Sequence, residues 1–338
     1  MNRLVLIDGN AIIHRAFHAL PPLSTKDGQP INAVYGFTSM LLRVIQDLTP
    51  TYVIVVFDRP EPTFRKKLFK EYQSHRPKMD EGLASQFSFV KKVVETMHIP
   101  IFEKAGYEAD DVIGTLARQV TNKIQNSEFR IQNEKRKIDE VVIVTGDRDI
   151  LQLVTDHVKV YMPVKGLSEA KLYGEEDVIE KFGLPPMQIP DYKGLVGDPS
   201  DNYPGVNGIG PKTAITLLNK FKTVEGLYAA MDKKKWPLEF VPERVIGVLK
   251  HYRDDAFLSK KLATIVCDVP LTIDLSRLTA PITDSDDVVK LFEQFEFHSL
   301  MKRLMIEGPS TSLRVKKENG KRKEKKDKKE DDNQLSLL

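Results

Sequence analysis

The stretch Leu4-Val5-Leu6-Ile7-Asp8-Gly9-Asn10 decides the fold, because a short apolar run stops there at an aspartate and a turn. Such a run, bounded by turn residues, is typical of a strand that is buried on both faces of a parallel sheet. The pattern occurs twice more: residues 52–57 are followed by Asp58, and residues 141–144 by Thr145-Gly146-Asp147-Arg148-Asp149. Further strand candidates are residues 98–102 and 158–162.

Segments with helical spacing lie between these strands, and this alternation predicts a parallel sheet with helices on both faces. They are residues 11–20, 33–48, 86–97 and 110–120, whereas the polar residues 121–140 indicate a surface excursion. After about residue 174 strand signals nearly vanish, and short helices separated by Gly and Pro follow. We therefore predict an α/β domain at 1–174, a helical domain at 175–308 and a disordered basic tail at 309–338.

The composition excludes several classes of protein. With 41% hydrophobic and 29% charged residues, the 338-residue chain can build a core and is long enough for two folded units. Cys267 is its single cysteine and no HExxH pattern joins its histidines, so neither a disulfide framework nor a Cys/His metal site is expected. No apolar run reaches the roughly 18 residues of a membrane span, and no signal peptide precedes the first strand, so we expect a cytoplasmic protein.

The net charge of the chain is small and lies in one segment. The total is +3, and residues 315–338, with nine basic and six acidic side chains, account for all of it. Because the remainder is neutral, binding to nucleic acid would require basic residues that gather on one surface.

Acidic residues gather at places that a parallel sheet would bring together. The carboxyl ends of parallel strands share one edge, where ligands bind, and acids of a helix start at 108–111 and of a loop at 197–202 could join them there. A single aspartate after a strand is more often a turn former or a helix cap than a metal ligand. Acids at a helix start can be there because negative charge stabilises the positive end of the helix dipole. The full set is Asp8, Asp58, Glu108, Asp110, Asp111, Asp147, Asp149, Asp198 and Asp201.

A cluster of this kind needs cations. Two like charges about 5 Å apart repel by roughly 3 kcal/mol at an effective dielectric of 20, so several such pairs would rival the stability of a domain. Carboxylate oxygens select hard ions such as Mg²⁺ or Mn²⁺. Two such ions about 4 Å apart suit phosphodiester hydrolysis without a Ser, Cys or His nucleophile. We therefore predict a two-metal hydrolytic site.

In order along the chain, these stretches resemble the 5′-nuclease domain of bacterial DNA polymerase I, within the flap endonuclease family. The likeness covers about residues 3–300 and includes Ser74-His75-Arg76-Pro77, Glu108–Ala117 and Gly197–Asn202, with nothing that resembles a polymerase domain. It implies a PIN-like sheet with a helical domain, and a stand-alone enzyme that cleaves 5′ ends and 5′ flaps with Mg²⁺, for which Mn²⁺ can substitute. By motif, the resemblance assigns Asp8, Asp58, Glu108 and Asp110 to a first metal, Asp147, Asp149, Asp198 and Asp201 to a second, and Asp111 to a position near both.

The basic segment at 61–78 has interleaved aromatic rings, which suits a channel for a single strand, although a solvated amphipathic helix is the plainer alternative. Its candidate DNA contacts are Lys66, Lys67 and Lys70. The resemblance places the segment in a helical arch at about 61–100, and it implies substrate contact by Arg15 and catalytic roles for Arg65, Tyr72 and Arg76. Two positions depart from the family: Phe17 replaces a common Tyr, and Gln73 replaces a usual Lys, with Lys70 and Lys78 as candidate replacements.

Residues 205–214 form the second signal for nucleic acid. The stretch nearly matches an ATPase phosphate loop, but Pro211 precedes Lys212-Thr213 and no strand leads in, so a helix–hairpin–helix at about 203–222 fits better. Gly208 and Gly210 would allow the turn, and a helix starting near Pro211 would present its N–H groups to duplex phosphates, beside Lys212 and Thr213. A plain Gly-rich turn is the alternative. In the family this hairpin also binds K⁺ through backbone carbonyls.

The basic tail carries a short apolar peptide. Residues Gln334-Leu335-Ser336-Leu337-Leu338 resemble the peptide with which bacterial replication proteins bind the sliding clamp, with Leu338 in place of a terminal aromatic residue. The alternative is a solvated tether; a tail bound to a clamp would raise the local enzyme concentration at nicks and flaps.

The sequence thus predicts a monomeric, nucleoid-associated 5′–3′ exonuclease and flap endonuclease. Its substrates would be DNA with 5′ flaps, nicks or ends and RNA/DNA hybrids, in primer removal, replication and repair, with no membrane partner. Two alternatives stay open at this point: a PIN-like ribonuclease, and a DNA-junction binder without catalytic activity.

Overall fold

The computed structural model describes residues 1–125, 138–166, 169–233 and 242–307. Residues 1–281 form one compact unit, and a second unit begins at Ile282. The predicted tail at 309–338, with its clamp peptide, and most of the excursion at 121–140 lie outside the described residues. No helix in the described part of the chain is long and apolar enough to cross a membrane.

A six-stranded sheet in the order β3-β2-β1-β4-β5-β6 forms the centre of the first unit. Its strands are β1 (Arg3–Asp8), β2 (Tyr52–Val56), β3 (Ile101–Phe102), β4 (Glu140–Val144), β5 (Val158–Lys165) and β6 (Glu169–Tyr173). The first five are parallel, and the five predicted strands are all present. The sequence pattern does not predict β6, which pairs antiparallel with β5, because this edge strand is polar and only its last residue is buried.

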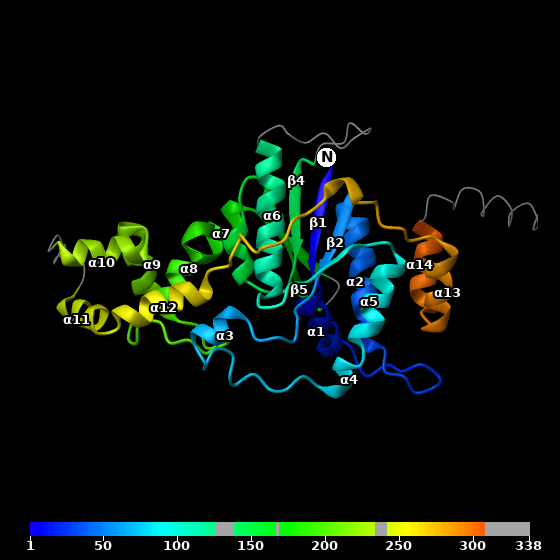
Figure 1. The fold of residues 1–338 in the computed structure, drawn as a ribbon, viewed down its shortest axis with the longest axis horizontal. Coiled ribbons are helices and arrows are strands. Elements are labelled where there is room, and N and C mark those ends of the chain that lie inside the picture. Colours follow the sequence, from blue (N-terminus) through cyan, green and yellow to red (C-terminus); the bar gives the residue numbers. More distant parts are fainter. Residues whose placement is uncertain (126–137, 167–168, 234–241, 308–338) are drawn as a thin grey trace, which may run out of the picture. The chain divides into compact units, whose positions relative to one another are not determined.

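The strand register aligns the acids at one edge. Asp8 pairs with Val56 at the ends of β1 and β2, and Ile7 pairs with Val144 at the end of β4. The acids that follow these three strands therefore leave the sheet at the same level. In Figure 1 this carboxyl edge lies next to α1 and α3, opposite the edge that carries the N-terminus.

Helices cover both faces of the sheet, as predicted. On one face, α6 (Ala109–Gln125) packs against the side chains of Leu4 and Leu6, which share a hydrophobic cluster with Ile113 and Leu116. Figure 1 shows α1 (Gly9–Ala19), α2 (Asn32–Leu48) and α5 (Phe87–Thr96) on the other side. Because successive side chains of a strand alternate between faces, both faces of β1 are buried.

The arch segment is less helical than expected. It contains the short helices α3 (Phe64–Leu68) and α4 (Glu81–Ala84) and the longer α5, and residues 69–80 form turns and irregular chain. This stretch lines the cavity described below, and its apolar side chains Phe69 and Tyr72 pack in a small cluster with Tyr203 and Leu262.

Helices also dominate the chain after the sheet. They are α7 (Glu175–Phe182), α8 (Ile189–Val196), α9 (Pro211–Phe221), α10 (Val224–Asp232), α11 (Glu243–His251) and α12 (Arg253–Ala263), with 3-10 turns at Asp149–Leu153, Pro186–Gln188 and Leu275–Arg277. Leu217, Leu218 and Tyr228 centre a second hydrophobic cluster. After α12 the chain returns to the sheet, where Ile265 and Ile273 join the core beside α6. The domain limits at 174 and 308 stay predictions.

The second unit contains α13 (Asp286–Gln294) and α14 (His298–Glu307). Ser285 caps α13 by accepting a hydrogen bond from the backbone N–H of Val288. The rings of Phe292 and Phe295 both lie within 6 Å of Phe297, at centroid distances of 5.7 and 5.5 Å, and form its small core.

The packing of α8 on α12 gives a first prediction. A Cβ atom at Gly194 would lie 2.8 Å from the Cβ of Lys260 and 3.1 Å from the carbonyl oxygen of Ala256. Gly194→Ala should therefore lower the free energy of unfolding by about 1–2 kcal/mol through overpacking, as measured by urea denaturation. Gly247 in α11 is the matched control, because a methyl group added there would meet no atom within 4 Å, and Gly247→Ala should raise stability by up to about 1 kcal/mol. Equal effects of both substitutions would contradict the account.

Candidate active site

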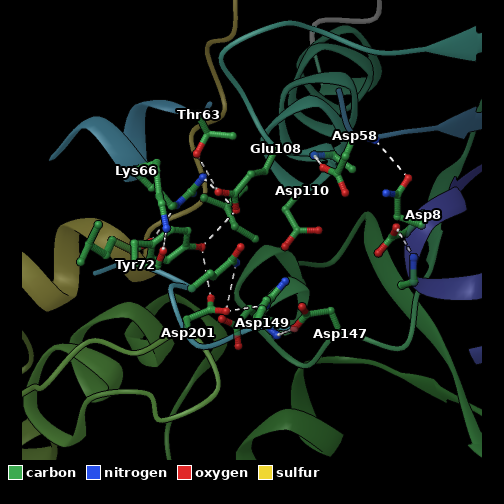
Figure 2. A pocket seen from close by; sticks show the side chains of 18 of the residues that line it. Asp8, Asp58, Thr63, Lys66, Tyr72, Glu108, Asp110, Asp147, Asp149 and Asp201 are labelled. Carbon is green, nitrogen blue, oxygen red and sulfur yellow. Dashed lines mark hydrogen bonds and ion pairs between the residues drawn. The ribbon is translucent and has the colours of Figure 1, made fainter. Parts of the chain in front are cut away.

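A cavity of about 710 Å³ lies at the carboxyl edge of the sheet. Its acidic side chains come from separate parts of the chain: the ends of β1, β2 and β4, the start of α6 and the loop after α8. Figure 2 shows them around one space, with Asp110 aimed into its middle. The predicted acids that line it are Asp8, Asp58, Glu108, Asp110, Asp147, Asp149 and Asp201.

The first group of acids holds the sheet edge and two helix starts. Asp8 accepts hydrogen bonds from the backbone N–H of Ala11 at 2.9 Å and from the Thr145 hydroxyl at 2.7 Å, and so caps α1. Asp58 accepts one from the backbone N–H of Ala109 at 2.7 Å, at the start of α6. Backbone capping therefore fixes the direction of both carboxylates.

Burial and mutual repulsion perturb this group. Burial, with the nearby charges of Asp58 and Asp147, raises the pKa of Asp8 to about 7. The pKa of Asp110 is also raised well above its ordinary value, by burial and by the charges of Asp147 and Asp8. Acids in this state resist ionisation unless a cation enters.

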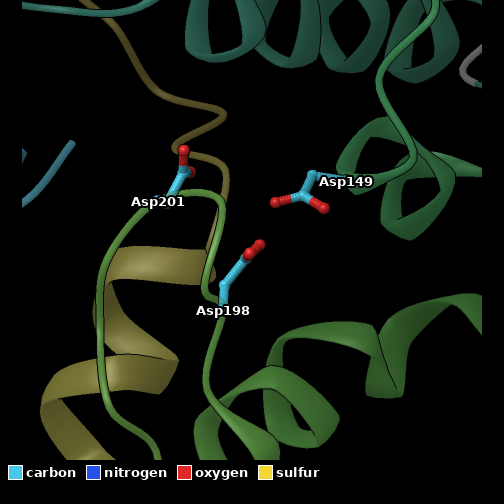
Figure 3. A group of neighbouring side chains, drawn as sticks. All are labelled: Asp149, Asp198 and Asp201. Carbon is cyan, nitrogen blue, oxygen red and sulfur yellow. The ribbon is translucent and has the colours of Figure 1, made fainter. Parts of the chain in front are cut away.

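A second group consists of Asp149 and Asp201, which line the cavity, and Asp198, which does not line it but lies beside them. Asp149, Asp198 and Asp201 each offer a carboxylate oxygen within 4.8 Å of the others, and Figure 3 shows Asp149 and Asp198 turned toward each other. Lys193 of α8 forms ion pairs with Asp149 and Asp198. Burial raises the pKa of Asp149 to about 7, even though Lys193 acts in the opposite direction. Although burial acts to raise it, hydrogen bonds from Lys193 and Ser200 hold the pKa of Asp198 below its ordinary value.

Tyr72 joins the two groups. Its hydroxyl lies 3.1 Å from Glu108 Oε2 and 3.1 Å from Asp201 Oδ2. A phenol has one proton to donate, so it can hydrogen-bond to only one of these carboxylates at a time. Burial, together with the charges of Glu108 and Asp201, raises the pKa of Tyr72, which keeps the phenol neutral. The ring of Tyr203 stacks on Tyr72 at a centroid distance of 6.4 Å.

Two residues of the sequence prediction, Arg65 and Asp111, form a buried ion pair beside the cavity. Asp111 is fully buried, and its oxygens accept hydrogen bonds from both terminal nitrogens of Arg65 (2.7 and 2.8 Å) and from the backbone N–H of Val266. Arg65 is 2% exposed and also donates to the carbonyl oxygens of Leu262 and Thr264. The donors of Arg65 are thus engaged inside the protein, and the structure does not bring Asp111 into the cavity. Arg65 itself lines the cavity, so its catalytic role and the position of Asp111 near the metals stay predictions, while this pair ties the base of the arch segment to the end of α12 and the chain after it.

Arg76 and Lys66 are at the cavity mouth, as predicted. Arg76 donates to Asp201 Oδ1 at 2.5 Å, and Lys66 donates to the carbonyl oxygen of Tyr72 at 2.6 Å. Gln73, at a positive φ of 52°, donates to Asp201 Oδ1 at 3.0 Å. Lys70 and Lys78, the candidate replacements for a lysine at position 73, are exposed and do not line the cavity.

The other predicted DNA contacts lie elsewhere on the surface. Lys67 is exposed on α3 and does not line the cavity. Arg15 donates to the carbonyl oxygen of Gly166 in the turn between β5 and β6. These two residues therefore stay predictions as substrate contacts.

The hairpin before α9 has the expected local geometry. Gly208 has a φ of 91°, and α9 begins at Pro211 after Gly210, whose φ of −94° makes no special demand. The first turn of α9 leaves Lys212 exposed and Thr213 half-buried. Gly205, at a φ of 62°, is required as well, since a Cβ atom there would lie 2.2 Å from the backbone nitrogen of Gly197. The predicted helix start is confirmed, and phosphate binding stays a prediction.

Sequence reasoning missed three residues of the site. Lys193 lies five residues before Asp198, but nothing in the sequence says that α8 turns it toward Asp149. Thr63 donates to Glu108 Oε1 at 3.0 Å, and Thr145 donates to Asp8. A hydroxyl residue directly after β4 was the one available signal, since its side chain leaves the sheet beside the β1 acid.

Comparison with known proteins places nearly the whole chain in one family. A family model described as "5'-3' exonuclease, N-terminal resolvase-like domain" matches residues 3–183, and one described as "5'-3' exonuclease, C-terminal SAM fold" matches residues 184–286. A 5'-3' exonuclease of Aquifex aeolicus is 36% identical over 304 residues, which cover 90% of this chain and 96% of that protein. DNA polymerase I of Bacillus caldotenax is 40% identical over 91% of this chain. The chain spans about a third of the length of such polymerases.

Solved structures share the fold. A T5 D15 flap endonuclease in a pseudo-enzyme-product complex with DNA and metal ions has a TM-score of 0.61 and 20% identity, over 78% of this chain and 90% of that one. The catalytic core of Rad2 in complex with a DNA substrate has a TM-score of 0.55 and 15% identity, over 90% of this chain and 92% of that one. These likenesses support the sheet with flanking helices that the sequence predicted.

The raised pKa values predict how the metal-free protein responds to pH. Carboxyl groups that titrate near pH 4 when unfolded and near pH 7 when folded bind more protons in the folded state between these values, so stability must fall as pH rises. Thermal or urea unfolding in EDTA should therefore show a loss of roughly 2–4 kcal/mol for each such group from pH 4.5 to pH 7.5. Asp8→Asn, which keeps the cap of α1, should flatten this dependence. If the free energy of unfolding of that variant depends on pH as strongly as that of the wild type, the pKa of Asp8 is not raised in the folded protein.

Proposed function

The chain belongs to the 5′–3′ exonuclease family, whose members hydrolyse phosphodiester bonds, and from this premise we propose that it is a structure-specific nuclease that removes 5′ ends and 5′ flaps. Its substrates would be DNA and RNA/DNA hybrids with flaps, nicks or ends, in primer removal, replication and repair. The observation that carries the proposal is the convergence of acids from separate segments on one cavity. Both family matches favour this proposal over a PIN-like ribonuclease and over a non-catalytic junction binder.

The donor set suits divalent cations. Every candidate ligand is a carboxylate, the pKa values of Asp8, Asp110 and Asp149 are raised, and three carboxylate oxygens of the second group lie within 4.8 Å of one another. Hard ions such as Mg²⁺ take oxygen ligands of this kind, and Mn²⁺ can substitute. We assign the first ion to Asp8, Asp58, Glu108 and Asp110, and the second to Asp147, Asp149, Asp198 and Asp201. Such ions, when bound, would activate water and stabilise the charge of the reacting phosphate.

The protein's own residues would place the strand. Arg76 and Lys66 at the mouth offer cations to the phosphates next to the cleaved bond. Tyr72, neutral and 3.1 Å from both Glu108 and Asp201, would donate to one of them at a time and place its hydroxyl between the two acid groups. Arg65, which lines the cavity and is paired with Asp111, would hold this segment in place beside the strand.

Duplex binding would fall to the hairpin and α9. The backbone N–H groups at the start of a helix hold phosphates without reading sequence, and Gly208, Gly210, Lys212 and Thr213 are the residues that we propose there. Carbonyl oxygens of the same hairpin would bind K⁺. The substrate is then selected by the combination of a duplex on α9 and a free 5′ strand at the cavity.

Three further proposals come from the sequence. The protein would act as a monomer, in the cytoplasm and in association with the nucleoid. Its peptide Gln334–Leu338, which lies outside the described residues, would bind a sliding clamp. The clamp would then concentrate the nuclease at nicks and flaps.

Asp110 gives the sharpest test of the metal proposal. Asp110→Asn removes a charge from the middle of the cavity without changing the size of the side chain, so it should lower kcat by a factor on the order of 10³ while flap binding in Ca²⁺ is kept. The measurement is single-turnover cleavage of a 5′-labelled flap in Mg²⁺. Asp254→Asn, at an exposed acid on α12, is the matched control and should leave the rate unchanged. Cleavage by D110N at the wild-type rate would contradict the proposed ligand set.

The clamp proposal is tested separately. Deletion of residues 334–338 should abolish association with the sliding clamp in a surface-binding assay and leave cleavage of a free flap unchanged, because the candidate metal ligands all lie between Asp8 and Asp201. Clamp association that survives the deletion would show that the peptide is not the contact.

A further inference from the structure

Lys193 is held between two acids of the second group. It extends from α8, its side chain is 16% exposed, and its ammonium pairs with Asp149 Oδ1 and with Asp198 Oδ2. Asp149 begins the 3-10 turn after β4, and Asp198 belongs to the loop after α8. The lysine therefore links two separate elements at the place where their carboxylates meet.

The first group of acids is paired less completely. Among the described residues, Glu108 of this group forms an ion pair with Arg65 at 3.4 Å, whereas Asp8, Asp58 and Asp110 form none with a Lys or Arg. The two halves of the cavity thus differ in charge balance. In the first group Arg65 reaches only Glu108, whereas in the second Lys193 pairs with Asp149 and Asp198, and Arg76 pairs with Asp201.

We propose that Lys193 is the resident counter-ion of the second acid group, and that a divalent cation enters this group by displacing its ammonium. The inference rests on the proposed function, since it concerns the second ion of that site. It adds an order of events: the first group takes an ion on Asp8, Asp58 and Asp110 without displacing a side-chain cation from them, and the second group takes one only in exchange for the lysine.

Geometry and charge make the two occupants exclusive. The oxygens of Asp149, Asp198 and Asp201 that could hold an ion lie within 4.8 Å of one another, which leaves room for one cation between them. A divalent ion requires oxygens at about 2.0–2.6 Å, so it would lie within a few ångströms of an ammonium on the same carboxylates and repel it strongly. Four methylene groups give the lysine side chain the freedom to leave without a movement of α8.

The consequence is unequal binding of the two ions. Binding of the second ion must offset the loss of two ion pairs, so it should be weaker than binding of the first. Without metal, the lysine keeps Asp149 and Asp198 together and the loop after α8 in place. Both effects depend on the charge of Lys193 and can be measured without substrate.

Mn²⁺ binding to the full-length protein, measured by calorimetry, tests this inference. The wild type should bind two ions, the second at least roughly tenfold more weakly than the first. Lys193→Met should raise the affinity for the second ion by roughly tenfold or more, and it should lower Tm in EDTA by an amount that Mn²⁺ restores. Lys193→Arg, which keeps the charge, should resemble the wild type in both measurements.

Lys66→Met is the matched control, because it removes a positive charge from the same cavity at a residue that pairs with a carbonyl oxygen instead of with the acids. It should leave the affinity for the second ion unchanged. If K193M and K66M raise that affinity equally, loss of any positive charge near the cavity explains the effect, and the proposed displacement of Lys193 is wrong. If K193M binds the second ion no more tightly than the wild type, the inference is likewise overturned.

Nuclear magnetic resonance of the Lys193 side chain separates this failure from failure of the proposed function. In a Mg²⁺ titration its Nζ signal, identified by its absence in K193M, should shift with the second equivalent of ion and not with the first. A signal that stays constant while two ions bind would overturn the displacement and leave the nuclease proposal standing. A wild-type protein that binds no ion would contradict the nuclease proposal and this inference together.

Discussion

Repulsion between carboxylates at one edge of the sheet is the constraint on which the rest of the structure depends. Acids from three strand ends, a helix start and a loop share a cavity of about 710 Å³. Local contacts of the fold reduce this repulsion. Backbone N–H groups donate hydrogen bonds to Asp8 and Asp58, and Lys193 pairs with Asp149 and Asp198. These contacts do not remove the stress, since Asp8 and Asp149 keep pKa values near 7. A buried cluster that resists ionisation at neutral pH is poised to take up divalent ions.

The frame around the cavity explains why this stress is tolerated. Fully buried strands with matched register fix the three strand ends. The buried pair of Arg65 and Asp111 attaches the base of the arch segment to the chain after α12, whose residues Ile265 and Ile273 rejoin the core of the sheet. The helices after residue 174 are thereby anchored to the sheet at two places. The loop that carries Asp198 and Asp201 is held by a different contact, because the backbones of Gly197 and Gly205 at its two ends pack directly against each other.

Much of this could be predicted from the sequence, because strand-end acids are local signals whose convergence follows from parallel topology alone. The start of α9 was likewise set by Gly210 and Pro211. What could not be predicted depends on tertiary contacts. The charge of Arg65 does not reveal that this residue is buried and paired with Asp111. The five-residue spacing between Lys193 and Asp198 does not reveal that Lys193 also reaches Asp149. The polar strand β6 forms only because β5 offers it a free edge. The resemblance predicts a helical arch segment, and residues 69–80 form turns instead.

The most direct test of the central claim is anomalous diffraction from crystals of the protein soaked in Mn²⁺. Two peaks are expected in the cavity, roughly 4 Å apart, one contacted by Asp8, Asp58 and Asp110 and the other by Asp149, Asp198 and Asp201. A cavity that stays without anomalous density at millimolar Mn²⁺, or peaks that lie away from these carboxylates, would contradict the account.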